Sequence, residues 1–312
     1  MISKNFLRYF RYTKNKYWSK FLIENGVQIP DFSYNKTSKK IYIRSVDAHF
    51  AVGEFPLFFK GYKKYCLKFI EFQFSFQFIN KEMFLHKENL VFKIETLEEL
   101  FIINEVFIEN TYKINSQKEY VVFDIGMNVG IASLFFSQFN NIKKIYGFEP
   151  FEKTFKALSI NLALNPVNNT KIEAFNYGLS NENKFMHCQF DNENRGNVGI
   201  KNNDFITLTS VIEKVKFKNA AEVLEPYIKE NYDMNKILKL DCEGSEYDIL
   251  ESLLSKNLVS EFDICIIEWH KMDNFKKRLF NIIEVLKKNN FIVLTIGSFQ
   301  QEAGMIYCIK QV

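Results

Sequence analysis

The stretch Tyr120-Val-Val-Phe-Asp-Ile-Gly-Met-Asn-Val-Gly130 decides the fold of this chain. Its first half is apolar and β-branched, which is typical of a short strand buried on both faces. Two glycines, Gly126 and Gly130, follow this strand, and apolar or small residues then recur at helical spacing from Val129 to Phe136. A strand, a glycine turn and a helix open a doubly wound α/β unit, in which ligands bind beyond the carboxyl ends of the strands.

The turn has the spacing Asp-x-Gly-x-Asn-x-Gly and differs from the dinucleotide fingerprint Gly-x-Gly-x-x-Gly. Asn128 stands where a dinucleotide fold needs glycine, so that the backbone can approach the pyrophosphate. Asp124 adds a carboxylate that repels phosphate and favours a cation, such as the ammonium or sulfonium of S-adenosylmethionine (SAM). The turn therefore points away from NAD and towards SAM. A glycine turn that only joins a strand to a helix remains the alternative.

The composition sets the broad class of the protein. The chain has 312 residues, 47% of them apolar, which allows one large domain or two smaller ones with a substantial core. A net charge of +4 gives no indication of a nucleic-acid partner. Five cysteines without a Cys-x-x-Cys pair indicate neither a disulfide framework nor a zinc ribbon and fit a reducing cytoplasm. No apolar run approaches the roughly 18 residues of a membrane span, and we expect a cytoplasmic protein without a signal peptide.

Residues 1–21 are basic, contain no acidic residue and carry aromatic residues at helical spacing. A helix of this kind can lie on an anionic membrane surface, which would place the protein at the inner face of the membrane. The alternative is a helix that packs its aromatic side chains on the body of the protein. Both interpretations predict an amphipathic helix.

The next part of the chain predicts a small β-rich region. Strand-like runs occur at 41–46, 68–79 and 90–94, and the second alternates phenylalanine with polar residues, as a half-buried antiparallel strand does. It carries no catalytic signature. We therefore interpret residues 1–95 as an accessory region and residues 96–312, which begin with a helical pattern, as the catalytic domain.

From Val121 onward strand and helix patterns alternate, which predicts a parallel sheet. The second strand, 143–150, ends in Glu149, where an acid can accept hydrogen bonds from both hydroxyls of a ribose. Pro150 favours an extended residue before it and suits the first turn of the next helix.

Asn176 and Tyr177 follow the third strand, at a place where a bound adenine commonly lies in such folds. Asn176 could hydrogen-bond the base and Tyr177 could pack beside it, or both residues simply shape the turn. Farther on, the polar segment 191–204 predicts a loop that could cover the site.

Four polar residues follow the next two strands. Asp241 and Glu243 lie at the end of the fourth strand, and Glu268 and His270 lie at the end of the fifth. Because the carboxyl ends of parallel strands share one edge, we expect these side chains near the glycine turn. The last two apolar runs are joined by a short connection and must pair antiparallel, which is unusual for a plain dinucleotide fold.

Five segments together resemble the FkbM family of SAM-dependent methyltransferases: Phe123–Gly130, Gly147–Pro150, Asn176–Asn181, Leu238–Glu246 and Ile267–His270. The similarity extends from about residue 96 to 310, and Leu-Lys-Leu-Asp-x-Glu-Gly-x-Glu is its most specific part. Met127 departs from the Ala or Pro that family members often carry. The resemblance implies a Rossmann-like class I methyltransferase sheet with an antiparallel terminal strand. It also implies methyl transfer from SAM, usually to a hydroxyl oxygen of a sugar or natural product.

SAM already carries an activated methyl group, so the protein must align the acceptor and take its proton. His270 is the first candidate for the base because its unperturbed pKa lies near neutrality. Asp241 is the second, as base or as orienter, and Glu268 completes the candidate catalytic group. Asp241, Glu243 and Glu268 could also gather Mg²⁺, which would acidify the acceptor hydroxyl.

The expected function is O-methylation of a saccharide, a glycoconjugate or another small hydroxyl acceptor. The alternatives are an N-methyltransferase, a nicotinamide-dependent oxidoreductase, which Asn128 and Asp124 disfavour, and a non-catalytic glycan-binding module. The residues expected to hold SAM are Asp124, Gly126, Asn128, Gly130, Glu149, Pro150, Asn176, Tyr177 and Asp241.

Overall fold

The computed structural model describes residues 3–191, 210–271, 274–298 and 301–311. The chain forms two compact units, Met1–Asn110 and Thr111–Val312. The helix expected to open the catalytic domain belongs to the first unit, where α5 (Leu97–Ile103) packs on α3 (Pro56–Gly61). The division therefore follows this helix, whereas the sequence placed the boundary in front of it.

The first unit contains two small antiparallel sheets, which confirms the expected β-rich region. One sheet consists of β1 (Phe32–Asn35), β2 (Lys40–Ile43) and β3 (Ala48–Phe50), and the other of β4 (Ser75–Ile79), β5 (Glu82–Lys87) and β6 (Leu90–Ile94). The other α-helices described in this unit are α1 (Lys4–Thr13), α2 (Lys16–Glu24) and α4 (Leu67–Glu71). Packed aromatic rings, among them Phe50, Phe58 and Phe59, supply much of its core.

Two segments of the first unit differ from the sequence prediction. The single helix expected over 1–21 is two helices, because Lys14 adopts a left-handed conformation and Asn15 caps the second helix. The strand expected over 68–79 is helical up to Glu71, and the chain turns at Gln73, where φ is +64°. Among the described residues, every helix is too short or too polar to cross a membrane.

The second unit is built on a seven-stranded sheet with the order β15-β16-β14-β13-β7-β8-β9. Its described strands are β7 (Tyr120–Ile125), β8 (Ile142–Phe148), β9 (Ile172–Phe175), β13 (Asn235–Leu240), β14 (Ile264–His270), β15 (Phe291–Ile296) and β16 (Ala303–Lys310). All pairs are parallel except the two that β16 makes. The predicted doubly wound sheet with an antiparallel terminal strand is confirmed.

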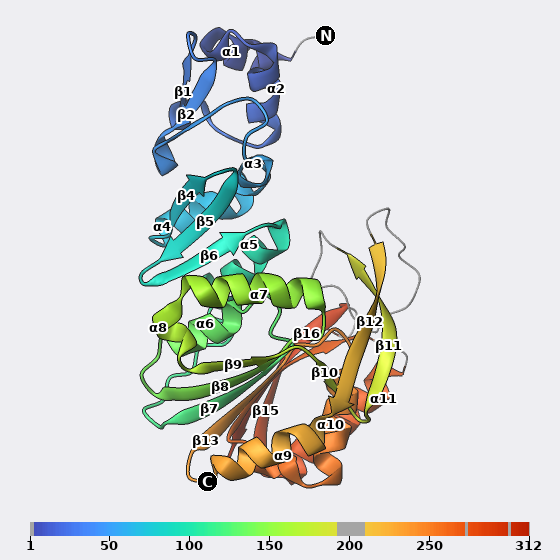
Figure 1. The fold of residues 1–312 in the computed structure, drawn as a ribbon. Coiled ribbons are helices and arrows are strands. Elements are labelled where there is room, and N and C mark those ends of the chain that lie inside the picture. Colours follow the sequence, from blue (N-terminus) through green and yellow to red (C-terminus); the bar gives the residue numbers. More distant parts are fainter. Residues whose placement is uncertain (1–2, 192–209, 272–273, 299–300, 312) are drawn as a thin grey trace. The chain divides into compact units, whose positions relative to one another are not determined.

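Helices cover both faces of this sheet. Figure 1 shows α6 (Ile131–Ser137), α7 (Glu152–Leu164) and α8 (Pro166–Asn169) on one face, and α9 (Ala220–Glu230), α10 (Glu246–Ser255) and α11 (Phe275–Lys288) on the other. All six residues of β7 are buried, which explains its nearly continuous apolar sequence. A large cluster of buried apolar side chains lies between the sheet and α9, α10 and α11.

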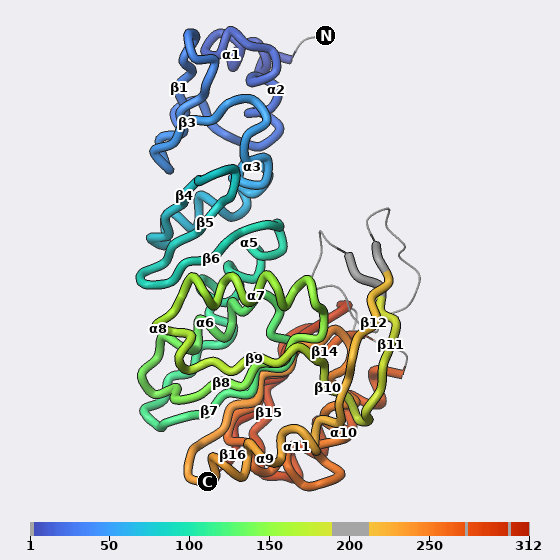
Figure 2. Tube along the Cα trace, in the orientation of Figure 1, coloured from blue at the N-terminus to red at the C-terminus, as the bar shows by residue number. Residues whose placement is uncertain are grey.

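A small second sheet lies beside the main one in this unit (Figure 2). It has the order β10-β12-β11 and consists of β10 (Gly178–Ser180), β11 (Lys184–Asp191) and β12 (Ser210–Asn219). The loop expected over 191–204 lies outside the described residues from position 192 onward.

The position of β7 determines where a ligand can bind. This strand pairs with β8 on one side and β13 on the other, so the strand order reverses direction at β7. Such a switch point is where open α/β sheets bind ligands, beyond the carboxyl ends of the strands. The segments that follow β7, β8 and β13, and the last residues of β14, share this edge.

Candidate functional site

The turn after β7 is fixed against both neighbouring strands. Gly126 has φ +83°, and a Cβ at this position would lie 1.7 Å from the carbonyl oxygen of Asp241. The backbone N–H groups of Gly126 and Met127 donate to the carbonyl oxygen of Phe148 at 3.1 and 3.0 Å. Gly130, with φ +86°, then begins α6. Because β13 approaches so closely, only glycine fits at position 126.

Glu149 holds this turn from the neighbouring strand. Its buried carboxylate accepts hydrogen bonds from the backbone N–H groups of Asn128, at 2.9 Å, and Phe151, at 3.0 Å. Burial raises the pKa of Glu149 to about 7, because desolvation outweighs these two hydrogen bonds. The structure thus brings Glu149 and the glycine turn together, as the sequence spacing predicted. A contact of Glu149 with a ribose stays a prediction.

Asn176 and Tyr177 lie on the same edge, after β9. The side-chain amide of Asn176 donates to the carbonyl oxygens of Glu149, at 3.0 Å, and Pro150, at 3.4 Å. The ring of Tyr177 packs on that of Phe148, with 5.7 Å between centroids. Both residues shape the protein here, and their proposed contact with an adenine stays a prediction.

Asp124 is fully buried and has a cationic partner within the protein. Its Oδ1 lies 2.9 Å from Nζ of Lys239, and its Oδ2 accepts a hydrogen bond from the hydroxyl of Ser133 at 2.6 Å. Lys239 also donates to the carbonyl oxygen of Gly126 at 2.7 Å. The carboxylate of Asp124 is therefore part of a buried network that holds the turn through Lys239, and Lys239 already balances its negative charge. The sequence around Asp124 did not reveal this internal cation, and attraction of a ligand cation by Asp124 stays a prediction.

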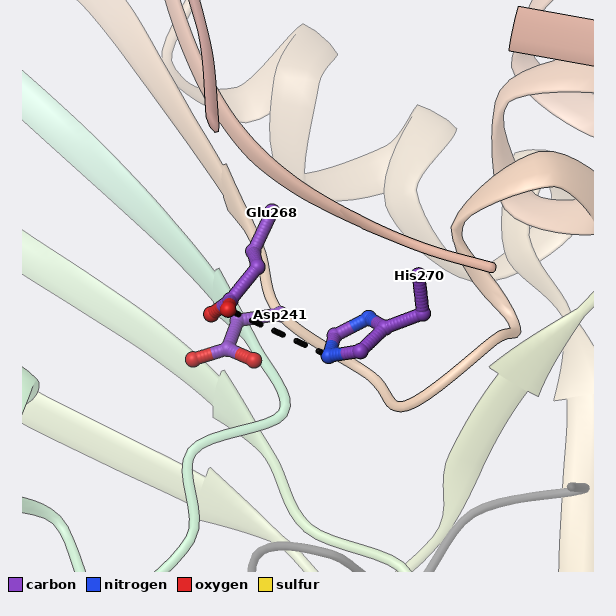
Figure 3. Close-up of side chains that lie close together, drawn as sticks. All are labelled: Asp241, Glu268 and His270. Atoms are coloured by element: carbon purple, nitrogen blue, oxygen red, sulfur yellow. Dashed lines mark ion pairs between the residues drawn. The ribbon is translucent and has the colours of Figure 1, made fainter. Parts of the chain in front are cut away.

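Asp241, Glu268 and His270 lie together above this turn. Figure 3 shows the imidazole of His270 pointing toward the two carboxyl groups, and its Nε2 lies 4.0 Å from Oε1 of Glu268. Asp241 and Glu268 are hydrogen-bonded to each other, and the hydroxyl of Tyr112 donates to Oδ2 of Asp241 at 3.2 Å. The ends of β13 and β14 thus gather the three predicted catalytic residues into one cluster.

A network of carboxylates fixes the ring of His270. Nδ1 lies 2.9 Å from Oε1 of Glu246, which also accepts a hydrogen bond from the backbone N–H of Cys242 at 2.8 Å. Nε2 lies 3.5 Å from Oε2 of Glu243. Burial alone would lower the pKa of His270, but Glu243 and Glu246 outweigh it and raise the pKa to about 11. At neutral pH the ring is therefore an imidazolium, which cannot accept a further proton.

Asp241 differs from His270 in access and charge. Its side chain is 29% exposed, compared with 5% for His270. Partial burial would raise the pKa of Asp241, but the charges of Lys239 and His270 and the hydrogen bonds in the cluster lower it below its ordinary value. Asp241 is therefore an ionised carboxylate that a ligand can reach.

The sequence family described as the methyltransferase FkbM domain matches residues 124–293, which is more than half of the chain. The chain belongs to this family. The match begins at the last residues of β7 and ends within β15, so it contains the turn, Glu149 and the cluster of Asp241, Glu268 and His270.

Solved structures similar to this FkbM-domain chain include the methyltransferase FkbM of Methylobacillus flagellatus KT, with 12% identity and a TM-score of 0.42, over 66% of this chain and 47% of that one. A precorrin-6y C5,15-methyltransferase of Geobacter metallireducens GS-15 has 14% identity and a TM-score of 0.37, and the match covers 66% of this chain and 88% of that one. TrmK of M. capricolum, solved with S-adenosylhomocysteine, has 13% identity and a TM-score of 0.38, and the match covers 65% of this chain and 67% of that one. The chain spans about half the length of the Methylobacillus protein. No curated protein matches it.

Three residues of the FkbM-domain site were missed by sequence reasoning. Lys239 interrupts the apolar run of β13, and a lysine in a strand buried on both faces is a signal that it has a partner. Glu246 closes the Asp-x-Glu-Gly-x-Glu segment, but the sequence does not reveal its contact with His270. Tyr112 carries no signal, because 129 positions separate it from Asp241.

The residues expected to gather Mg²⁺ are only partly brought together. Among the described residues, the donor atoms that lie within 4.8 Å of one another belong to Asp241, Glu268 and His270. Glu243, which the sequence placed in this set, faces Nε2 of His270 instead.

Proposed function

We propose that this methyltransferase uses SAM and methylates a hydroxyl oxygen of a saccharide, a glycoconjugate or a similar small molecule. The observation that supports this most strongly is the turn Gly126–Gly130, held by Glu149 at the switch point of the sheet and facing an acidic cluster. SAM carries an ammonium and a sulfonium, so a carboxylate-rich edge suits it better than it suits the pyrophosphate of a dinucleotide.

The residues around the turn fit the parts of SAM. The glycines Gly126 and Gly130 let the backbone approach the methionine portion without side-chain interference. Glu149 would accept hydrogen bonds from the ribose, and Asn176 and Tyr177 would border the adenine. When bound, SAM supplies a methyl group attached to a positively charged sulfur. After the transfer, the rest of the cofactor leaves as S-adenosylhomocysteine.

We assign the proton-accepting role to Asp241. The acceptor hydroxyl loses its proton to this carboxylate while the new oxygen–carbon bond forms and the sulfur–carbon bond breaks. Asp241 is ionised and reachable, whereas His270 is a buried imidazolium between Glu243 and Glu246. His270 then contributes positive charge and fixes the geometry of the cluster.

Calorimetry on the full chain tests the cofactor. SAM and S-adenosylhomocysteine are expected to bind one to one, and NAD is expected not to bind. Binding of NAD without binding of SAM would favour the oxidoreductase alternative and contradict the proposal.

The acceptor is tested with a panel of nucleotide sugars, glycans, small alcohols and amines. Asp241→Asn is expected to transfer the methyl group about 10²- to 10⁴-fold more slowly at saturating SAM, because it lacks the proton acceptor. Asp233→Asn, an exposed carboxylate outside the cluster, is the matched control and should be fully active. Transfer to amines alone would replace the O-methylation proposal with N-methylation.

A further inference from the structure

We propose that Asp241, Glu268 and His270 bind one divalent transition-metal ion, with Mn²⁺ as the representative ion. Binding of the ion follows from the cluster alone. Its role, to hold and polarise the acceptor hydroxyl, rests on the proposed methyltransferase function.

The three donor groups are already close enough to share an ion. They come from the carboxyl ends of the neighbouring parallel strands β13 and β14, and their ligand atoms lie within 4.8 Å of one another. Two ligands at about 2.1 Å from one ion lie at most about 4.2 Å apart. Three ligands around one ion cannot all be that far apart, so the cluster must close by roughly an ångström, and side-chain rotations can supply this.

His270 has the supporting shell that metal-binding histidines share. Ligating histidines usually give their second ring nitrogen to a carboxylate, which fixes the orientation of the ring. Here Nδ1 is held by Glu246 at 2.9 Å, and Glu246 is itself fixed by the backbone N–H groups of Cys242 and Gly244. Nε2 lies 3.5 Å from Oε2 of Glu243 and 4.0 Å from Oε1 of Glu268, and Figure 3 shows it pointing toward Asp241 and Glu268.

Asp241 and Glu268 are also in contact with each other within the cluster. Two carboxyl groups in hydrogen-bonding contact need a proton or a cation between them, because two negative charges repel. Nζ of Lys239 lies 3.6 Å from Oδ2 of Asp241 but is closer to Oδ1 of Asp124, at 2.9 Å. A divalent ion would replace the proton on Nε2 of His270 and would supply the positive charge that the imidazolium now gives to the two carboxylates.

The donor set and its exposure indicate which ion and which ligand fit. One imidazole and two carboxylates form a mixed nitrogen and oxygen set, which suits Mn²⁺ or Fe²⁺ better than the all-oxygen surroundings preferred by Mg²⁺. The side chains of Asp241 and Glu268 are 29% and 30% exposed, so water or an acceptor hydroxyl can complete the coordination. An ion there would lower the pKa of that hydroxyl.

The test measures metal binding in the absence of SAM and acceptor. The full chain is stripped with a chelator, dialysed and titrated with Mn²⁺, and bound Mn²⁺ is counted from the loss of the electron paramagnetic resonance signal of the free ion. We expect one Mn²⁺ per chain, loss of this binding in Glu268→Gln, and about 10- to 100-fold weaker binding in Glu246→Gln. The exposed Glu230→Gln is the matched control and should bind as the parent does.

The proposal is overturned if the parent binds no Mn²⁺, or if Glu268→Gln binds it unchanged. SAM binding, measured separately by calorimetry in the presence of chelator, keeps this outcome distinct from failure of the methyltransferase proposal. Normal SAM binding by a variant also shows that the variant is folded. If Glu268→Gln does not fold, His270→Gln provides the same comparison.

Discussion

Lys239 and Asp124 form a buried ion pair beneath the glycine turn, with side chains 3% and 0% exposed. Replacing Lys239 by methionine would leave the charge of Asp124 buried without its counter-ion. We expect Lys239→Met to lower the free energy of unfolding by about 3–5 kcal/mol, measured by urea denaturation.

The double variant Lys239→Met with Asp124→Asn is the control, because it removes both charges. It should recover most of the lost stability, since the cost arises from the unpaired carboxylate. A double variant that is as unstable as Lys239→Met alone would show that the loss comes from packing and not from charge.

Glu149 predicts a pH dependence of stability. Its pKa is raised from 4.5 to about 7 in the folded chain. Its contribution to stability is therefore fully present below pH 4.5 and is lost as the pH rises through about 7, with a total loss of about 3 kcal/mol. In Glu149→Gln this loss should disappear. Urea unfolding of both proteins without SAM, at several pH values from 5 to 8, measures it, and parallel curves would contradict the prediction.

For these residues, the sequence predicted where each one lies in the fold better than it predicted which side chains each one contacts. Gly126, Gly130 and Glu149 were recognised because the spacing between a turn and the next strand end is local information. The pairing of Asp124 with Lys239 depends on which strands are neighbours in the sheet. The burial of His270 between two glutamates, which changes its protonation, was likewise not contained in the sequence pattern.

The turn between β7 and α6 is the element that most constrains the fold. Gly126→Ala would place Cβ 1.7 Å from a backbone oxygen, whereas Gly130→Ala would meet the flexible end of Leu158 at 2.7 Å. Both positions have positive φ, so both lose the conformational preference of glycine. We expect Gly126→Ala to cost about 3 kcal/mol or more and Gly130→Ala about 1–2 kcal/mol.

Thermal and urea unfolding of the two variants measures this difference. Equal losses would mean that the strained backbone, which the two positions share, accounts for the whole effect. The close approach of Asp241 to the turn would then have no energetic weight.

Among the elements, strands made of apolar runs were the easiest to predict. The strand β7 and the terminal β15–β16 hairpin follow from apolar runs and connection lengths. The region 68–79 was predicted less well, because alternating phenylalanines describe β4 but do not exclude a helix just before it. The association of residues 1–21 with membranes stays a prediction, and liposome flotation with and without this segment checks it.

At the scale of the whole molecule, all residues that we assign to cofactor binding belong to the unit Thr111–Val312. We therefore expect S-adenosylhomocysteine to slow hydrogen exchange in Gly126–Gly130 and in the segments that follow β8 and β9. Exchange in Met1–Asn110 should not change, because none of its residues is assigned to the cofactor. Hydrogen-exchange mass spectrometry of the full chain measures both units together.

A reduction of exchange throughout the first unit would contradict this assignment. It would mean that cofactor binding involves both units, and that the family match over 124–293 does not contain the complete site. The acceptor, by contrast, lies beyond what the sequence pattern specifies, because no motif for it was found in either unit.

The most direct test of the central claim follows a labelled methyl group from SAM. The full chain is incubated with SAM that carries a deuterated methyl group and with the panel of hydroxyl acceptors, and the products are analysed by mass spectrometry. We predict one S-adenosylhomocysteine formed for each deuterated methyl found on an acceptor oxygen, with both products strongly reduced in Asp241→Asn. Bound SAM that is never converted, on any acceptor that carries a hydroxyl, would contradict the account.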